Sequence, residues 1–424
     1  MRTKSLVIFS ITLVLTVLVV LLVANLSMGN KPIDVPLAHL YPVADMQFKR
    51  AVGSVLTPGL TDGNRAQELL NGDQIFPAML SGIRNAQRSI TLETYIYFSG
   101  ATGDEFSKAL RERAASGVKV HVLLDWIGGE LEDALIERMR ASGVEIHRYN
   151  APTWHSLARF NNRTHRKLMV IDGRIGFIGG VGLADKWSGH AQDPDHWRDT
   201  HFQVEGPVVG QLQSAFLNNW LAAAGDVLRG EAYFPPLEPV GDQLAQAFSA
   251  SPGGSSKTMQ LLYLMSITAA QQSIDLSAAY FIPDEVAKQS LVAAARRGVR
   301  VRIIVPGPHM DMAVVRHASR NNWGPLLEAG IEIYEYEPTM FHCKVIVVDG
   351  LWTSVGSTNF DSRSFSVNDE TNMNVYDAPF AQRQIGVFEQ DLQQTSRVSL
   401  EQWQGRPIWQ KMLDSGASLL SSQL

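Results

Sequence analysis

Apolar and polar positions follow two series of the same kind along this chain. In the first series, apolar runs rich in β-branched residues predict strands at residues 89–98, 118–125 and 144–148. Helical spacing between them predicts helices at 104–115 and 131–142. The second series predicts strands at 273–280, 299–305 and 331–336, with helices at 284–296 and 312–329. Strands that alternate with helices indicate an α/β fold, and here the pattern occurs twice.

A continuous apolar run precedes both series. Residues 5–30 carry no charge, and residues 6–26 are predominantly apolar. About 21 residues at roughly 1.5 Å each match the hydrocarbon core of a bilayer. The run is longer than the apolar region of a secretory signal, and no clear small-residue cleavage site follows it. We therefore expect an uncleaved membrane anchor.

Charges and prolines divide the chain further. Arg2 and Lys4 precede the apolar run, a bias that places the amino terminus in the cytoplasm and the body outside, in a periplasm if the cell has one. Residues 229–242 contain three prolines and read as a linker. The predicted organisation is an anchor (1–30), a connector (31–78), a first half (79–228), the linker (229–242) and a second half (243–424).

The same sequence motif occurs in both halves. Residues 165–182 read HRKLMVIDGRIGFIGGVG and residues 342–359 read HCKVIVVDGLWTSVGSTN, so both follow His-x-Lys-x4-Asp-x6-Gly-(Gly/Ser). The apolar run after each His predicts a buried strand, on which His165 and Lys167 share one face, as do His342 and Lys344. Asp172 and Asp349 each precede a glycine and predict tight, structural turns. The matched spacing indicates one site assembled from both halves.

Two imidazoles and two ammonium groups make an anion site, since Lys suits phosphate and His titrates near neutral pH. The expected reaction is phosphoryl transfer in two displacements: one His attacks phosphorus, and the other protonates the leaving alcohol and deprotonates the incoming one. The lysines would hold the equatorial oxygens, and the scheme needs no metal or other cofactor.

A nucleophilic His also needs a partner for its second ring nitrogen. Asp199 follows His165 and Glu370 follows His342 at similar offsets, each in a strand-like segment. These two carboxylates are the candidates.

The two motif copies resemble the double HKD motif of the phospholipase D superfamily, over about residues 76–424. Within it the chain is similar to bacterial cardiolipin synthases through ITLETYIYF (90–98), WRDTH (197–201), YFIPD (280–284), FDSRSF (360–365) and NDETN (368–372). The resemblance implies two tandem phospholipase D-like α/β/α sandwich halves related by a pseudo-twofold axis, preceded by one transmembrane helix.

The resemblance also implies site residues. The family counts Asp172 and Asp349 with the two His–Lys pairs, and it often has an asparagine at the position of Asn359. Gly180 and Ser357 are supporting candidates for another reason: the Gly179–Gly180 and Gly356–Ser357 steps would let a ligand approach the backbone closely. One departure is visible: where the second copy has Asn359, the first has Gly182.

The implied activity is transphosphatidylation. One phosphatidylglycerol would phosphatidylate the enzyme and lose glycerol, and a second lipid alcohol would take the phosphatidyl group. His165 would be the nucleophile and His342 the acid and base. The acceptor stays open between phosphatidylglycerol, phosphatidylethanolamine and water. Expected partners are phospholipids and the bilayer.

Three rival functions remain. A phospholipase D hydrolase would use the same residues with water as acceptor. A nuclease is disfavoured by the net charge of −5, and a non-catalytic adaptor by the intact motifs. A zinc site would have to use a set whose spacing fits no common ligand pattern: His190, His196, His201, Asp193, Asp195 and Asp199.

Two further features bear on the site. The single cysteine, Cys343, excludes an intramolecular disulfide, and strand alternation turns it away from His342, as a packed thiol. A basic stretch without Asp or Glu leads into the first motif and is either a headgroup attractant or a solvated loop: Arg148, Arg159, Arg163, Arg166 and Lys167. The loops at 150–164 and 306–312 flank the site and are candidates for a lipid entrance.

Overall fold

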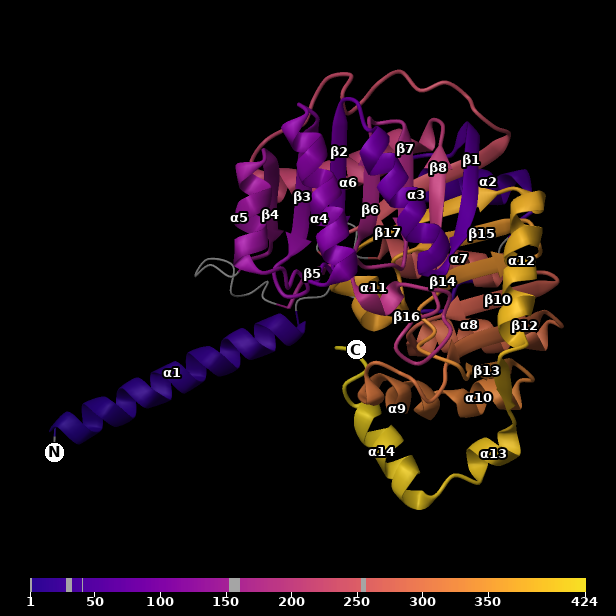
Figure 1. Cartoon of the computed structure of the whole chain (residues 1–424). Helices are drawn as coiled ribbons and strands as arrows, with labels where there is room; N and C mark the ends of the chain where they lie inside the picture. The colour runs from indigo at the N-terminus through magenta and orange to yellow at the C-terminus, as the bar shows by residue number, and fades with distance from the viewer. Residues whose placement is uncertain (1, 28–32, 40, 152–160, 253–256) are drawn as a thin grey trace.

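The computed structural model describes residues 2–27, 33–39, 41–151, 161–252 and 257–424. One sheet of 16 strands runs through both halves (Figure 1). The first half contributes β1 (Thr61–Leu70), β2 (Ser89–Thr94), β3 (Lys119–Asp125), β4 (Val144–Tyr149), β5 (Arg163–Thr164), β6 (Lys167–Ile171), β7 (Ile175–Gly179) and β8 (Thr200–Glu205). The second contributes β9 (Gln243–Ala250), β10 (Ser273–Ala278), β12 (Arg300–Pro306), β13 (Glu332–Tyr336), β14 (Lys344–Val348), β15 (Trp352–Gly356), β17 (Asn368–Tyr376) and β18 (Thr395–Val398).

The strand order repeats outward from the middle of the sheet. It runs β18-β13-β12-β10-β14-β15-β17-β9-β1-β8-β7-β6-β2-β3-β4, with β5 added to β17. Read from the antiparallel β9–β1 pair, the two directions pass through corresponding strands of the two halves. The expected pseudo-twofold arrangement of two α/β/α halves is confirmed.

Helices cover both faces of the sheet (Figure 1). In the first half they are α3 (Asn71–Asn85), α4 (Ala101–Ala115), α5 (Asp133–Ala141) and α6 (Val208–Ala224). In the second half they are α7 (Thr258–Ala269), α8 (Glu285–Arg296), α9 (Ala313–Asn321), α10 (Trp323–Glu328), α11 (Ser362–Ser366) and α12 (Ala378–Leu392), followed by α13 (Leu400–Gln404) and α14 (Ile408–Ser418). Short pieces complete the fold: the 3-10 turn Asp185–Trp187 and the pair β11 (Phe281–Ile282) with β16 (Phe360–Asp361).

The amino-terminal helix α1 (Arg2–Ser27) extends away from the body (Figure 1). Its window Leu6–Val23 is apolar, is not buried, and is long enough to cross a membrane. The chain continues in the body at Ile33, whose backbone N–H donates to Oε1 of Gln260 at 3.0 Å.

The segment expected to be a connector, residues 31–78, contains regular helices and strands. This segment supplies α2 (Met46–Val55), all of β1 and the start of α3. β1 pairs with β8 just as β9 pairs with β17, so β1 has in the first half of the sheet the position that β9 has in the second. The sequence of β1, TDGNRAQELL, has no apolar run. One of its buried positions is Asn64, whose side-chain amide donates hydrogen bonds to the carbonyls of Thr61 and Gln243.

Two other boundaries differ from the prediction. The expected helix at 312–329 is divided at Asn322 into α9 and α10, since Pro325 fits only the first turn of a new helix. The expected strand at 89–98 ends at Thr94, where the chain leaves the sheet toward the motif residues. The expected linker at 229–242 has no helix or strand.

Candidate active site

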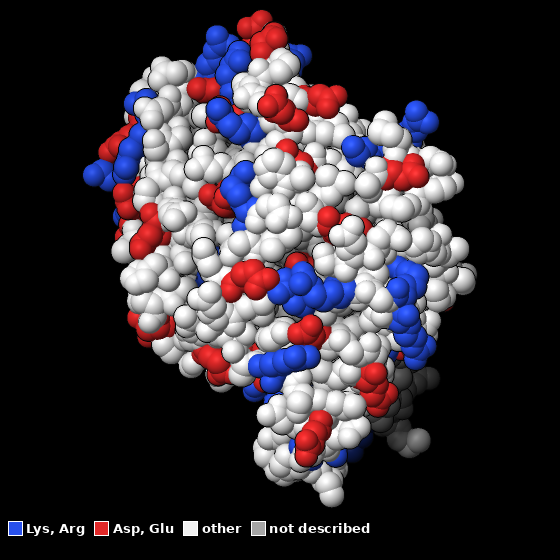
Figure 2. Space-filling view, turned by 90° about the vertical axis from the view of Figure 1, so that its right-hand side faces the viewer, with Lys and Arg blue, Asp and Glu red and all other residues white. Residues whose placement is uncertain are grey.

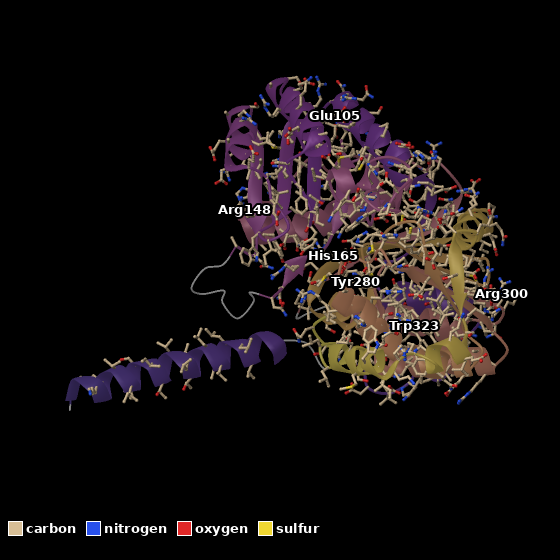
Figure 3. The ribbon with its side chains drawn as sticks, turned by 60° about the horizontal axis from the view of Figure 1, so that its bottom comes forward. Glu105, Arg148, His165, Tyr280, Arg300 and Trp323 are labelled. Atoms are coloured by element: carbon tan, nitrogen blue, oxygen red, sulfur yellow. The ribbon has the colours of Figure 1, made fainter. Side chains whose placement is uncertain are left out.

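The two motif histidines stand at the junction of the halves, each immediately ahead of a central strand. The backbone N–H of His165 donates to the carbonyl of Asp369 at 2.9 Å, and that of His342 donates to the carbonyl of Arg198 at 2.7 Å. Each histidine is thus docked on the opposite half, beside the strand that holds a candidate carboxylate. Figure 3 shows His165 next to Tyr280 of the second half, where the two halves meet.

The side chains cross the junction in the same way. Nδ1 of His165 lies 2.9 Å and 3.2 Å from the two carboxylate oxygens of Glu370. Nδ1 of His342 lies 2.7 Å from Oδ2 of Asp199. The structure brings both expected carboxylates to the site, but it exchanges their partners: pairing within each half, suggested by the similar offsets, is wrong. Each half therefore orients the histidine of the other.

Different groups support the two carboxylates. Ser357 donates its hydroxyl to Oε2 of Glu370 and accepts the backbone N–H of Thr371 at 3.1 Å. In the first half the corresponding residue is Gly180, and Nε1 of Trp187 donates to Oδ2 of Asp199 at 3.1 Å instead. A Cβ atom on Gly180 would lie 2.5 Å from Oδ1 of Asp199, so the carboxylate occupies the space of the missing side chain.

The two lysines are held by backbone carbonyls. Nζ of Lys167 donates to the carbonyl oxygen of His165 at 2.8 Å, and Nζ of Lys344 does the same to His342 at 2.8 Å. Both ammonium groups are nearly inaccessible, and the charge of Lys344 acts on Lys167 as a repulsion. Two buried cations in one place favour an anionic ligand between them.

Burial controls the protonation of the histidines and lysines. It lowers the pKa of His165 to about 4, against the opposing charge of Glu370. It also lowers the pKa of Lys167 to about 7. Burial, with the charges of Lys344 and Lys167, lowers the pKa of His342 well below its ordinary value. Both imidazoles are therefore neutral near pH 7, as a nucleophile or a base requires.

The pKa values of the two carboxyl groups shift in opposite directions. Burial raises the pKa of Asp199, although Lys344 opposes the shift. Burial also acts to raise the pKa of Glu370, but His165, Lys167 and the Ser357 hydroxyl outweigh it, and the pKa is lowered. The His165–Glu370 pair is thus the more strongly polarised of the two.

Asp172 and Asp349 take no part in this cluster. Asp172 accepts the backbone N–H groups of residues 87–89, and Asp349 those of residues 271–273, at 2.7–3.2 Å. Both have a φ of 52°, and each precedes a glycine in the hairpin turn that follows its motif strand. The motif strand of five residues separates each Asp from its Lys, by roughly 17 Å along an extended chain. The turns are as predicted, and both carboxylates bind backbone N–H groups of the segment ahead of a neighbouring strand.

A cavity of about 360 Å³ opens beside His165. It is lined by residues of both halves: Tyr95, Ile127, Asn161, Arg163, His165, Tyr280, Met312, Val315, Asn359, Asp361, Arg363, Ser364, Asn368, Gln423 and Leu424. Oδ1 of Asn359 is buried and has no hydrogen-bond partner among the described residues. Both loops expected at an entrance contribute to this wall, but residues 152–160 of the first lie outside the described residues.

The first half has no asparagine that corresponds to Asn359, because the backbone at Gly182 has no room for a side chain. A Cβ on Gly182 would lie 2.8 Å from Cβ of Ile96 and 3.0 Å from the ring of Trp187. The rings of Trp187 and Trp197 both lie 5.4 Å from the ring of His342. One side of the site is therefore walled by aromatic residues around His342, and the other opens to a polar cavity beside His165.

The histidines and aspartates considered as a zinc site do not form one cluster. His190 bonds Asp73 at 3.2 Å, His196 bonds Asp193 at 2.6 Å, and His201 is buried in β8 beneath the site. Among the residues that the structure describes, no group of three His, Cys, Asp or Glu side chains has the geometry of a metal site. Cys343 is buried as expected, and burial raises the pKa of its thiol to about 12.

The arginines of the basic stretch that leads into the first motif are not all available to bind an anion. Arg166 is inaccessible and lies 3.8 Å from both Glu93 and Asp369, and Arg148 lies 3.6 Å from Asp133. Arg159 lies outside the described residues. Only Arg163 lines the cavity.

Several residues of the site escaped sequence reasoning. Trp187 supports Asp199, and the ring of Tyr95 lies 5.4 Å from both the His165 ring and Nζ of Lys167. Arg198 binds Asp391 of α12 through two hydrogen bonds of 2.8 and 2.9 Å and so joins the halves behind the site. An isolated Trp or Tyr gives no signal of such a role, whereas Arg198 lies inside the WRDTH segment already noted.

Fold and site together define a phosphoryl-transfer enzyme of two similar halves with one shared His–Lys centre. The family model described as "Cardiolipin synthase, PLD-like domain" matches residues 79–220 and 263–392, and the chain belongs to this family.

Individual relatives agree with the family. The cardiolipin synthase of Geobacillus kaustophilus (strain HTA426) is 36% identical over 360 residues, which cover 84% of this chain and 72% of that protein. Cardiolipin synthase A of Pseudomonas syringae pv. syringae (strain B728a) is 34% identical over 346 residues, 80% of this chain and 71% of that protein. The predicted enzyme class is confirmed, and the relatives favour a phosphatidyltransferase over a hydrolase.

A solved structure supports the fold. The phosphatidylserine synthase of Haemophilus influenzae Rd KW20 matches with a TM-score of 0.68 at 15% identity, over 89% of this chain and all of that one. The family and the apolar, unburied α1 together indicate a membrane protein.

Proposed function

We propose that this enzyme transfers a phosphatidyl group from phosphatidylglycerol to the hydroxyl of a second phospholipid, with release of glycerol. The observation that supports this most is the crossed pair of buried His–carboxylate contacts with two buried lysines between them. Such a centre suits a phosphodiester. The lysines would stabilise its negative charge, while one neutral histidine attacks phosphorus and the other transfers protons.

The first displacement forms a covalent intermediate. Nε2 of His165 attacks phosphorus, the P–O bond to glycerol breaks, and the leaving oxygen takes the proton from Nε2 of His342. Nδ1 of His342 takes a proton from Asp199 in the same step, since burial raises the pKa of that carboxyl. His165 is assigned as the nucleophile because it faces the cavity, and because the ionised Glu370 holds the proton on Nδ1 and stabilises the positive ring that forms.

The second displacement reverses these roles. His342 removes the proton from the hydroxyl of the acceptor lipid, the oxygen attacks phosphorus, and the P–N bond to His165 breaks. Lys167 and Lys344 would stabilise the oxygens in both transition states, and Asn359 offers its unpartnered side chain to the phosphate or to an alcohol. No step calls for a metal or another cofactor.

Product analysis with labelled phosphatidylglycerol in detergent tests the activity. Diphosphatidylglycerol with an equal amount of free glycerol is the expected result. Phosphatidic acid as the sole product would replace this proposal with a hydrolase. A requirement for phosphatidylethanolamine, with release of ethanolamine, would keep the chemistry and change the donor, because this lipid has no hydroxyl that could attack phosphorus.

The proposed topology is one membrane span, with a cytoplasmic amino terminus and the body on the extracytoplasmic side. Its support is α1 with Lys4 at its amino-terminal end. Nucleic acid is not among the proposed partners, since acidic and basic side chains are interspersed on the face in Figure 2 without a large basic field. A reporter fused after Leu424 should be active outside the cytoplasm; cytoplasmic activity would overturn the topology.

A further inference from the structure

Two arginines line the cavity beside His165, one from each half. Arg163 belongs to β5, and Arg363 belongs to α11. Burial lowers the pKa of the Arg163 guanidinium, the charge of Asp125 opposes this shift, and the charge of Arg363 adds to it. The two guanidinium groups therefore repel each other, and an anionic ligand in the cavity would relieve the repulsion.

The carboxylates of Asp125 and Asp361, which interact with the charges of Arg163 and Arg363, also accept backbone N–H groups. Asp125 accepts the N–H groups of Ile127 and Gly128 on Oδ1 and that of Thr164 on Oδ2. Asp361 caps α11 by accepting the N–H of Ser364 at 2.7 Å.

Among the residues that the structure describes, the hydrogen-bond acceptors of Arg363 are neutral. Its guanidinium donates to Oδ1 and the carbonyl of Asn161 at 3.0 and 2.8 Å, and to the carbonyl of Gln423 at 3.3 Å. A guanidinium has five N–H groups, so donors remain for an anion.

Arg163 also has a defined spacing from the reacting centre. It lies two positions before His165, and the β5–β17 ladder continues from Arg163 and Thr164 into the His165 N–H. Residues i and i+2 of an extended segment lie about 7 Å apart and share a face. That spacing suits two phosphates joined by a single glycerol, one on His165 and one at the arginines.

We propose that Arg163 and Arg363 form a second anion site, which binds the phosphodiester of the acceptor lipid while its glycerol hydroxyl reaches the phosphorus on His165. The inference rests on the proposed function and deepens it, because it identifies the acceptor as an anionic glycerophospholipid. Water and free glycerol would reach the intermediate without using this site. A cavity of about 360 Å³ has room for such a headgroup.

The experiment compares two reactions of one enzyme. Full-length protein in detergent is given phosphatidylglycerol and labelled glycerol, and the formation of labelled phosphatidylglycerol and of diphosphatidylglycerol are followed together. Exchange of glycerol needs the covalent intermediate but no second phosphate. We expect Arg363→Gln and Arg163→Gln to reduce diphosphatidylglycerol formation about tenfold or more, the loss of one charge-assisted hydrogen bond, with exchange unchanged. Arg363→Lys should recover part of the loss.

Controls separate the possible failures. Arg397→Gln removes a guanidinium from an exposed ion pair with Glu332 and should alter neither reaction. If the wild-type enzyme performs neither reaction, the proposed function fails. If both reactions fall equally in folded Arg variants, the arginines hold the donor phosphate and the second anion site is refuted. If neither reaction falls, it is refuted as well.

Discussion

Replacing Glu370 by Gln removes the charge behind His165 while keeping the shape of the side chain. Glu370 is inaccessible, and its oxygens lie 2.9 and 3.2 Å from Nδ1 of His165. In the first displacement the ring of His165 becomes positively charged, so the carboxylate stabilises that state far more than the neutral ground state.

The magnitude follows from the distance. Two unit charges about 2.9 Å apart at an effective dielectric constant of about 20 attract by roughly 5–6 kcal/mol. Each 1.36 kcal/mol is a factor of ten in rate, so Glu370→Gln should lower kcat by about 10⁴-fold. The KM for phosphatidylglycerol should change little, since the ground state has a neutral imidazole.

The assay is steady-state formation of diphosphatidylglycerol by purified wild type and variant, with thermal unfolding as the check on the fold. The side chains of Ser357 and Asn368, which donate to the carboxylate, leave an amide enough partners for the variant to fold. A folded variant that keeps more than a tenth of the wild-type kcat would refute the reasoning, because the carboxylate would then not stabilise the reacting histidine.

The remaining predictions address the supporting residues. Gly180→Ala should reduce kcat at least 100-fold, because its Cβ would displace Asp199, whereas Gly386→Ala, which has open space, should leave kcat unchanged; equal effects would contradict the steric account. Asp172→Ala should lower the free energy of unfolding by about 2 kcal/mol, measured in urea, with kcat of the folded fraction retained, since it removes only backbone contacts; loss of kcat alone would give Asp172 a chemical role. Because the pKa of His165 is about 4 in the folded protein and about 6.5 in the unfolded chain, the unfolded chain binds more protons between these values, and stability falls as the pH is lowered through them. His165→Asn should therefore become more stable relative to wild type by about 3 kcal/mol between pH 7 and pH 4; a constant difference would contradict the shift.

The motif residues were accessible to sequence reasoning because their signal is local. The apolar runs after His165 and His342 are buried strands, and the Asp–Gly pairs are tight turns, as the pattern predicts. Duplication then indicated a shared centre. These inferences depend only on the spacing of residues within one half.

The crossed pairing of the carboxylates could not be predicted in this way. Asp199 and Glu370 have similar offsets from the histidines of their own halves, and nothing in the chain distinguishes a partner within one half from one across the junction. The exchange depends on how β5 docks against β17 and Arg198 against Phe341, contacts between segments remote in the sequence.

β1 and Trp187 escaped prediction for related reasons. β1 has no continuous apolar run, because only some of its positions are buried and one of them is Asn64, whose amide bonds Thr61, Gln243 and Val208. Trp187 donates a hydrogen bond to Asp199, as Ser357 does to Glu370 in the other half. Trp187 does not occupy the motif position that corresponds to Ser357.

The central claim is that one histidine forms a covalent bond to phosphorus in a site shared by the halves. The most direct test uses phosphatidylglycerol in which sulfur replaces one non-bridging oxygen with a defined configuration at phosphorus. Two successive in-line displacements predict a diphosphatidylglycerol analogue with retained configuration. Inversion would mean a single direct transfer between lipids, and it would contradict the phosphohistidine intermediate.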